Sequence, residues 1–353
     1  QTRTGVPLKG DLASNVLALA GITLNKNALP GDETGTRPGG IRIGTPWISQ
    51  LGFGKDDVAE LARIMHTLLA DAEPFRILTQ AGQTIERGKV SFRALEEARE
   101  RVQALIGRVG VSRKVRGHYE TGRIEVSSPV RPTAFVADHQ KHDAVLEPRD
   151  GWRVPVRFGD GKHEEDAVRK NVALADLGDH GILSVRGARA HGFLNTLATA
   201  DLSDLAVGAA RRTALLDGDG ALVDDVLVVR NAPDRWGFDV FTVLTSPGRA
   251  HAVATWFEAH SDGFVRFDPD DLYAKIPGPV VVTRQNAGGW ASLTRTAFAL
   301  LGPDAPELAA KLLPAAKDLA ADHAVEATAK DGRVTVVRTS WPGAESAVLF
   351  HVD

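Results

Sequence analysis

The stretch Gly21–Pro46, GITLNKNALPGDETGTRPGGIRIGTP, holds the densest local signals in the chain. Ile22-Thr23-Leu24 predicts a short strand, and Asn25-Lys26-Asn27 follows it with two amides and an ammonium group. Pro30-Gly31-Asp32 and Pro38-Gly39-Gly40 are strong turn signals. We therefore expect a loop that is ordered by its turns and lies near the surface.

The segment Ile41-Arg42-Ile43 alternates apolar, basic and apolar residues. This alternation predicts a strand in which both isoleucines are buried and Arg42 lies on the opposite face. A guanidinium held in this way is a planar fork that suits a carboxylate. The alternative is a surface arginine in a solvated ion pair, which stabilises a protein little.

Composition excludes several classes of protein. The 353 residues suffice for two or three domains, and 43% of them are hydrophobic, as in a soluble globular protein. A net charge of -3 gives no reason to expect nucleic-acid or membrane binding. There is no membrane-spanning apolar run and no signal peptide, so the cytoplasm is the expected location. Zero cysteines rule out disulfides, thiolate metal sites and a cysteine nucleophile.

Helical periodicity organises the first part of the chain. Residues 11–20 predict a helix, with Asp11 as N-cap and Gly21 as C-cap. Residues 55–71 predict the clearest amphipathic helix, with a stripe of apolar side chains and two aspartates in its first turn. Residues 1–73 are thus interpreted as a small α-β-β-α two-layer domain. Residues 74–132 follow as a helix, capped by Ser91 and ending near Arg108, and a linker rich in Arg, Gly, Ser and Pro.

The pattern changes to one of strands in residues 133–353. A hairpin is predicted from its turn, Asp217-Gly218-Asp219-Gly220, which lacks the glutamate of a calcium loop. Antiparallel strands with helices packed on one face indicate an α+β domain. The other strands are predicted at 151–156, 181–185 and 238–244, and helices at 164–177, 189–197 and 251–260.

The first region resembles the C-terminal small domain of serine hydroxymethyltransferase. That domain also has an asparagine-lysine-asparagine turn, a proline- and glycine-rich loop and a G-I-R-I-G-T-P segment. The resemblance implies that Arg42 holds the carboxylate of the amino-acid substrate and that Asn27 lies near the pteridine of folate. The family's pyridoxal phosphate lysine is not found in these residues. We therefore expect pyridoxal phosphate to act only through a domain upstream of this chain, which alone is not expected to perform the aldol chemistry.

The second region resembles the aminomethyltransferase of the glycine cleavage system, the folate-binding T-protein. The segments GWRVPV, ALADLGDHGILSVRG, LLDGDGALVDDVLVVR, ALLGPDAPELAAKLL and VVRTSWPGAESAVLFHV carry the likeness in the right order. The match is divergent and covers the family's first two-thirds, without its C-terminal barrel. It implies tetrahydrofolate as cofactor and a catalytic aspartate at Asp224-Asp225. Adjacent strand residues point to opposite faces, so at most one of the two faces a pocket; the alternative is a structural pair at the start of a strand.

Three positions depart from the T-protein pattern. Ser246 stands where the family has an amide, Trp341 replaces a tyrosine, and Val348 falls where an acidic residue would pair with the pterin. An unpaired pterin N–H donor would cost about 1–3 kcal/mol. The cluster Asp138, His139, His142 and Asp143 has spacing that suits a metal, but a solvated polar turn is the preferred interpretation, and no metal site is predicted.

These features predict part of a tetrahydrofolate-dependent one-carbon transferase of glycine and serine metabolism, acting by hydroxymethyl or aminomethyl transfer. The expected ligands are glycine or serine and folate, and the parent polypeptide is expected to form a homo-oligomer. One rival is a non-catalytic oligomerisation or scaffolding module attached to a pyridoxal enzyme. Another is a T-protein-like transferase that acts on a different methylated substrate.

Overall fold

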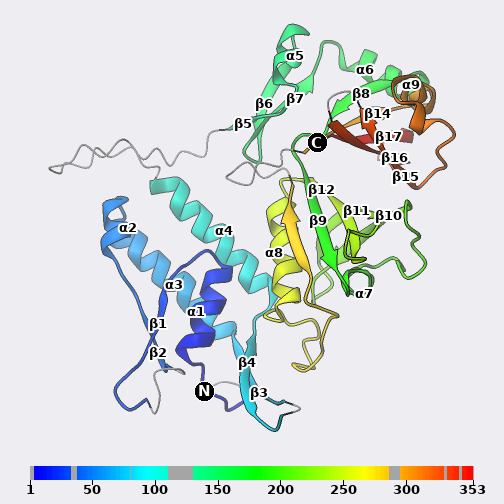
Figure 1. The fold of residues 1–353 in the computed structure, drawn as a ribbon. Coiled ribbons are helices and arrows are strands. Elements are labelled where there is room, and N and C mark those ends of the chain that lie inside the picture. The colour runs from blue at the N-terminus through cyan, green and yellow to red at the C-terminus, as the bar shows by residue number, and fades with distance from the viewer. Residues whose placement is uncertain are drawn as a thin grey trace. The chain divides into compact units, whose positions relative to one another are not determined.

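The computed structural model describes residues 4–32, 38–79, 81–109, 130–285, 295–329, 332–341 and 344–352 (Figure 1). The described residues form two compact units. Of the described residues, the first unit contains those numbered up to 109, 217–219 and 262–275, and the second contains those numbered 130–216, 220–261 and from 276 onward. Within the described ranges, no helix is both long and apolar enough to cross a membrane.

The first unit is built mainly of helices. Its apolar centre comes from α1, α3 and α4, whose residues Val16, Leu17, Ile64, Leu68 and Leu95 are almost fully buried. Two short antiparallel ribbons, β1–β2 and β3–β4, accompany the helices. The elements are α1 Gly10–Leu19, β1 Asn25–Asn27, β2 Gly40–Arg42, α2 Pro46–Gln50, α3 Lys55–Asp71, β3 Glu73–Leu78, β4 Thr84–Lys89 and α4 Phe92–Val109.

Local signals predicted helices α1, α3 and α4, whereas the short helix α2 was not predicted. Helix α3 covers the predicted residues 55–71. The Ser91 hydroxyl accepts a hydrogen bond from the Ala94 amide (3.2 Å), which confirms the predicted cap of α4. Gly21 follows α1 with a φ of +84°, the left-handed conformation that ends a helix. Lys9, not Asp11, is the N-cap of α1. The predicted strand at 22–24 was wrong, because β1 begins at Asn25. The predicted linker lies largely outside the described residues.

Residues 262–275 belong to the first unit although they come late in the chain. The Val90 amide donates to the Phe264 carbonyl (2.8 Å), and the Arg266 amide donates to the Val90 carbonyl (2.9 Å). The Arg266 guanidinium pairs with Asp71 (2.9 Å) and Glu73 (2.7 Å), and all three side chains are largely buried. These charge-assisted contacts join the segment to the end of α3 and the start of β3.

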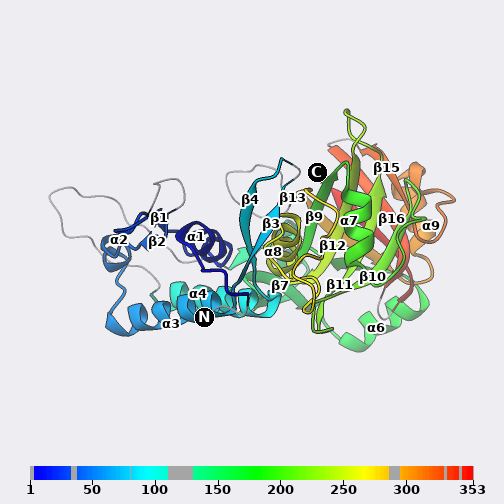
Figure 2. The same ribbon diagram turned by 90° about the horizontal axis from the view of Figure 1, so that it is seen from below.

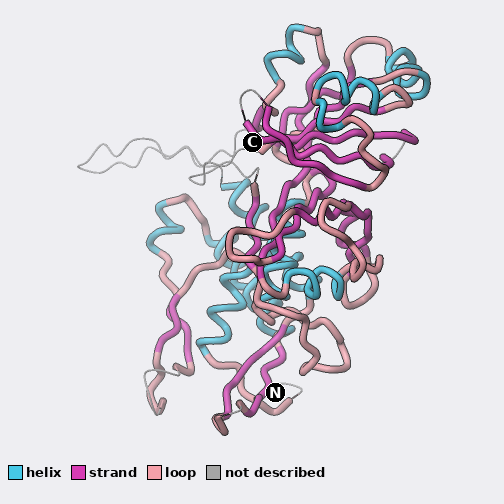
Figure 3. The backbone as a smooth tube through the Cα atoms, turned by 45° about the vertical axis from the view of Figure 1, so that its right-hand side comes forward, coloured by secondary structure: helices cyan, strands magenta, loops and turns pink. Residues whose placement is uncertain are grey.

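The second unit contains two antiparallel five-stranded sheets. One has the order β10-β11-β12-β9-β13 and the other β15-β16-β17-β14-β8. Figure 3 shows these strands in magenta. The strands are β8 Ala173–Asp176, β9 His180–Gly187, β10 Ala210–Leu216, β11 Leu222–Asn231, β12 Asp239–Pro247, β13 Val281–Arg284, β14 Thr296–Leu301, β15 His323–Ala329, β16 Gly332–Trp341 and β17 Ala344–Val352. A smaller sheet joins β5 Arg131–Pro132, β6 Val145–Arg149 and β7 Trp152–Arg157.

One apolar layer joins the two large sheets. It contains Ile182, Leu227 and Leu244 from the first sheet and Val337 and Leu349 from the second. Helices α7 Ala190–Leu197 and α8 Ala250–Ser261 pack on the first sheet, and α9 Ala305–Leu312 packs on the second (Figure 2). The order of layers is therefore helix, sheet, sheet, helix, which confirms the predicted α+β class.

The prediction of one helix over residues 164–177 was wrong. Helix α6 spans Gly161–Lys170, and its last part gives way to strand β8. Leu174, which was expected to point inward from that helix, is 66% exposed on β8. Pairing of β8 with β14 decides the outcome, because this long-range ladder satisfies backbone groups that helical spacing alone would place in a helix.

Close backbone packing at Gly10 generates the first testable prediction. A Cβ at this position would lie 1.9 Å from the Gly40 carbonyl oxygen. We expect Gly10→Ala to lower the free energy of unfolding by about 1–3 kcal/mol, because this clash outweighs the helix preference of alanine. Gly107→Ala is the matched control within α4, where the Cβ meets nothing within 4 Å. Urea unfolding that gave both variants equal stability would contradict this prediction.

His351 generates a second prediction. This histidine of β17 is 1% exposed, and neither ring nitrogen has a hydrogen-bond partner among the described residues. Burial, with a smaller contribution from Arg295, lowers its pKa to about 4. A depressed folded pKa means that stability is fully present above about pH 6.5 and is lost as pH falls toward 4, by roughly 3 kcal/mol in total.

The measurement is urea unfolding at several pH values between 7 and 4. We expect His351→Leu to remove this share of the pH dependence, whereas His163→Gln, at an exposed position, leaves it in place. An equally steep loss of stability in the wild type and in His351→Leu would show that another group is responsible.

Candidate functional site

The β1–β2 ribbon brings together the predicted residues of the first region. Asn25 pairs in register with Arg42, and Asn27 pairs with Gly40. Because directly opposed residues point to the same face, Asn25, Asn27 and Arg42 share one face of the ribbon. Lys26 lies on the other face, where it forms an exposed ion pair with Asp11 of α1 (2.6 Å). The Asn27 amide donates to the Ala28 carbonyl (3.1 Å).

Arg42 is exposed and has no ion-pair partner among the described residues. The prediction that its neighbouring isoleucines are buried was wrong, because Ile43 is 54% exposed and Ile41 is half-buried. A ribbon of two three-residue strands is too small to bury both isoleucines. Ile43 instead lines an apolar hollow of ≈ 240 Å³ together with residues that include Ile22, Leu24, Phe53, Met65, Leu105 and Ile106.

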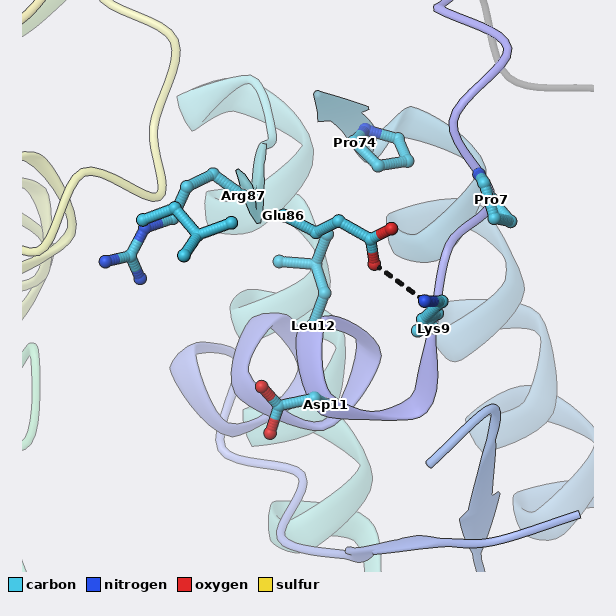
Figure 4. Close-up of a pocket in the computed structure, with 8 residues that line it drawn as sticks. Pro7, Lys9, Asp11, Leu12, Pro74, Glu86 and Arg87 are labelled. Atoms are coloured by element: carbon cyan, nitrogen blue, oxygen red, sulfur yellow. Dashed lines mark ion pairs between the residues drawn. The ribbon is translucent and has the colours of Figure 1, made fainter. Parts of the chain in front are cut away.

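A second hollow, of ≈ 290 Å³, lies beside the start of α1 (Figure 4). Glu86 turns toward Lys9 in this view, and the two form an ion pair of 3.1 Å. The remaining wall includes Asp11, Leu12, Arg87 and two prolines. Its positive and negative side chains balance each other, so this hollow favours no particular charged ligand.

Asp224 and Asp225 lie within β11 and point to opposite faces of the first sheet. Asp225 has the same parity as Leu227 and therefore lies on the face that meets the second sheet. Asp224 has the parity of Val226 and lies on the face that carries the helices. The sequence left open which of the two aspartates faces a ligand. Because side chains alternate along the strand, Asp224 and Asp225 lie in different environments.

Asp224 is 4% exposed and is held by the main chain. One carboxylate oxygen accepts from the Asp225 amide (2.9 Å), and the other accepts from the Ser246 amide (3.0 Å). Burial raises the pKa of Asp224, and the hydrogen bonds from Ser246 and Asp225 oppose this rise. The raised pKa means that ionisation of Asp224 costs stability as pH rises through that pKa. The hydrogen bond from the Ser246 amide to Asp224 connects β11 to the end of β12.

Asp225 is accessible and forms part of a group of three side chains. Its side chain is 46% exposed and pairs with Nη1 of Arg212 at 3.1 Å. The Arg212 guanidinium lies over the ring of Trp341, 5.2 Å from its centre, in a cation–π contact. Nη2 of Arg212 is buried and has no hydrogen-bond partner among the described residues. We call Arg212, Asp225 and Trp341 the β10–β11 cluster.

His180 borders this cluster at the start of β9. Its ring lies 5.6 Å from that of Trp341, and Nδ1 lies 3.0 Å from the buried carboxylate of Asp179. Across the sheet, Leu227, Leu244 and Ile182 form one row. Asp225 comes two residues before Leu227 in β11, and His180 comes two residues before Ile182 in β9. Polar side chains thus mark one end of the apolar layer between the sheets.

Two departures from the T-protein pattern can be placed. Val348 is 2% exposed and packs with Leu300 and Phe350 on the outer side of the second sheet, so it belongs to an apolar core. The backbone amide of Ser246 donates a hydrogen bond to the Asp224 carboxylate, and the Ser246 hydroxyl lies 3.4 Å from the Asp225 carbonyl oxygen.

The interpretation of His139 as part of a solvated turn was wrong. His139 lies in α5 Val136–Lys141, is 7% exposed and pairs with Asp176 through Nε2 at 2.7 Å. In the part of the chain that the structure describes, no three potential metal ligands of the His, Cys, Asp or Glu types gather in one place.

Comparison with known families identifies two regions of the chain. The profile of the GCVT N-terminal domain matches residues 135–347, which is more than half of the chain. The chain belongs to this family. The serine hydroxymethyltransferase profile matches residues 4–65. The combination of the two family regions, expected from the sequence, is thereby confirmed.

Known relatives carry aminomethyltransferase names. A probable aminomethyltransferase of Natronomonas pharaonis is 30% identical over 219 residues, which cover 62% of this chain and 55% of the relative. The aminomethyltransferase of Streptomyces avermitilis is 31% identical over 152 residues, 42% of this chain and 40% of the relative. The chain spans about half, or less, of the length of these relatives. The crystal structure of aminomethyltransferase T from Bartonella henselae aligns with 63% of this chain and 53% of its own, at 22% identity and a TM-score of 0.49.

Sequence reasoning missed Arg212 and His180. Arg212 precedes the predicted hairpin turn by five residues. In a strand it shares a face with Ala210 and Ala214, and this spacing was the available indication of the direction of its side chain. No local pattern connects either residue to Trp341, because that contact depends on how the two sheets pack.

Proposed function

We propose that this chain is part of a tetrahydrofolate-dependent one-carbon transferase of glycine and serine metabolism. Hydroxymethyl or aminomethyl transfer is the proposed reaction type. The observation that carries the proposal is the β10–β11 cluster, in which Arg212 contacts both an accessible carboxylate and an aromatic ring, in a chain with two folate-related family matches. The proposed domains are residues 1–73, related to serine hydroxymethyltransferase, a helix and linker at 74–132, and the T-protein-like region 133–353.

The chemistry of the cluster fits a reduced pterin. Asp225 offers a partly exposed carboxylate that can accept hydrogen bonds from N–H groups, and Trp341 offers an aromatic face. Val348 offers no such acceptor. We therefore propose Asp225, rather than the enclosed Asp224, as the group that faces the folate.

Each side chain has a distinct proposed role. Tetrahydrofolate, when bound, supplies the nitrogen that receives the carbon unit. Asp225 would accept a hydrogen bond from an N–H group of the bound folate, and would take the proton that this nitrogen loses as the carbon unit passes to it and the carrier of that unit leaves with the electrons of the broken bond. Asp224 is a positioning residue, since it fixes the Ser246 amide and the main chain of Asp225. Arg212 orients the side chain of Asp225 through their contact of 3.1 Å.

The first region contributes a second proposed binding surface. The resemblance to serine hydroxymethyltransferase supports Arg42 as the group that binds a glycine or serine carboxylate, with Asn27 near the folate. The shared face of the β1–β2 ribbon is consistent with both roles. Pyridoxal phosphate, homo-oligomer formation and a cytoplasmic location are proposed for the parent protein.

Calorimetric titration of tetrahydrofolate into the full chain tests the proposal. We expect micromolar binding that Asp225→Asn weakens about tenfold or more, because a hydrogen bond to a charged group contributes about 1.5–3 kcal/mol. Asp204→Asn is the matched control, since Asp204 also pairs with an arginine at the same hairpin, Arg211 (2.6 Å), and its side chain is 70% exposed.

Equal binding by the wild type and Asp225→Asn would move the folate site away from Asp225. No binding by the wild type would reject a folate site in this chain and favour the rival interpretation, a non-catalytic scaffolding module.

A further inference from the structure

Arg212 has more hydrogen-bonding capacity than the described protein uses. Nη1 pairs with Asp225, but Nη2 is buried without a partner in the described ranges. A guanidinium carries five N–H donors in a planar fork, and buried donors are normally satisfied. The flat face of the Arg212 guanidinium stacks on Trp341, so a ligand would be bound by the N–H groups at its edge.

The Arg212–Asp225 pair can be reached from solvent. The side chain of Arg212 is 29% exposed and that of Asp225 is 46% exposed. A partly exposed ion pair of this kind is weak, because water screens it. A ligand that supplies both a carboxylate and an amine can therefore replace it, since the ligand carboxylate pairs with Arg212 and the ligand amine pairs with Asp225.

The charges around the cluster select among anions. Asp225 lies 3.1 Å from Arg212, and the buried Asp179 carboxylate lies beside His180, which contacts the same Trp341 ring. A phosphate would bring two negative charges against these carboxylates. A zwitterion with adjacent positive and negative groups meets Arg212 and Asp225 without such repulsion.

We propose that the β10–β11 cluster binds a free α-amino acid, with its carboxylate on Arg212 and its amine on Asp225. This inference rests on the proposed function, because it names the class of molecule that carries the one-carbon unit to the folate. It gives the second region its own amino-acid site, distinct from the proposed Arg42 site.

The test is calorimetric titration of N-methylglycine, without folate, into the full chain carrying Arg42→Gln. That background removes the other proposed carboxylate site. N-methylglycine amide lacks the carboxylate and acetate lacks the amine. We expect both analogues to bind at least tenfold more weakly than N-methylglycine, since each leaves one charged partner unmatched.

Variants of the arginine provide the second comparison. We expect Arg212→Gln to weaken N-methylglycine binding at least tenfold, and Arg212→Lys to weaken it less, because lysine keeps the charge but loses the planar fork. Arg211→Gln is the matched control, since Arg211 is adjacent and pairs with Asp204 instead. Circular dichroism of each variant checks that it is folded.

The amide binding as tightly as N-methylglycine would overturn the inference without reliance on any variant at Arg212. Undiminished binding in folded Arg212→Gln would also overturn it, as would the absence of N-methylglycine binding. Amino-acid binding without tetrahydrofolate binding would support this site and reject the proposed folate transfer, whereas the reverse result would reject only this site.

Discussion

Packing of two five-stranded sheets through one apolar layer determines the arrangement of the second unit. Leu227, Leu244 and Ile182 form a continuous row in the first sheet, against residues such as Val337 and Leu349 of the second. Strand alternation then fixes the parity of every other side chain. Asp225 reaches the inter-sheet face because Leu227 is buried there, and Asp224 is excluded from that face for the same reason. A shift of one residue in the register of β11 would exchange the two aspartates.

The same packing explains the contrast between these neighbouring carboxylates. Asp224 is enclosed, uses both oxygens on main-chain amides and has a raised pKa. Asp225 lies where the apolar layer ends and shares the arginine that stacks on Trp341. Rigidity and accessibility are thus divided between adjacent residues. This division suits a site in which one carboxylate positions the backbone and the other meets a ligand.

Much of this arrangement could be predicted from local sequence, but not all of it. Helix α3, the Ser91 cap, the left-handed Gly21 and the hairpin of β10 and β11 follow from periodicity and turn chemistry, which act within a few residues. Strand β8 was missed because its identity depends on pairing with β14, more than a hundred residues away. The prediction that the isoleucines beside Arg42 are buried was wrong, because alternation shows which residues share a face of a strand but not whether other residues cover that face. The candidate aspartates were found by resemblance, whereas Arg212 and His180 join them only through the tertiary contact with Trp341.

The placement of residues 262–275 in the first unit has a consequence for how the chain is made. Arg266 closes a buried contact with Asp71 and Glu73, and the main chain around it pairs with Val90. During synthesis, the ribosome releases the amino-terminal helices long before it adds this segment. The first unit therefore cannot acquire its full set of native contacts as it emerges, although domains are generally thought to fold in order from the amino terminus. Completion of the first unit therefore waits until residues 262–275, which lie within the later family region, have been translated.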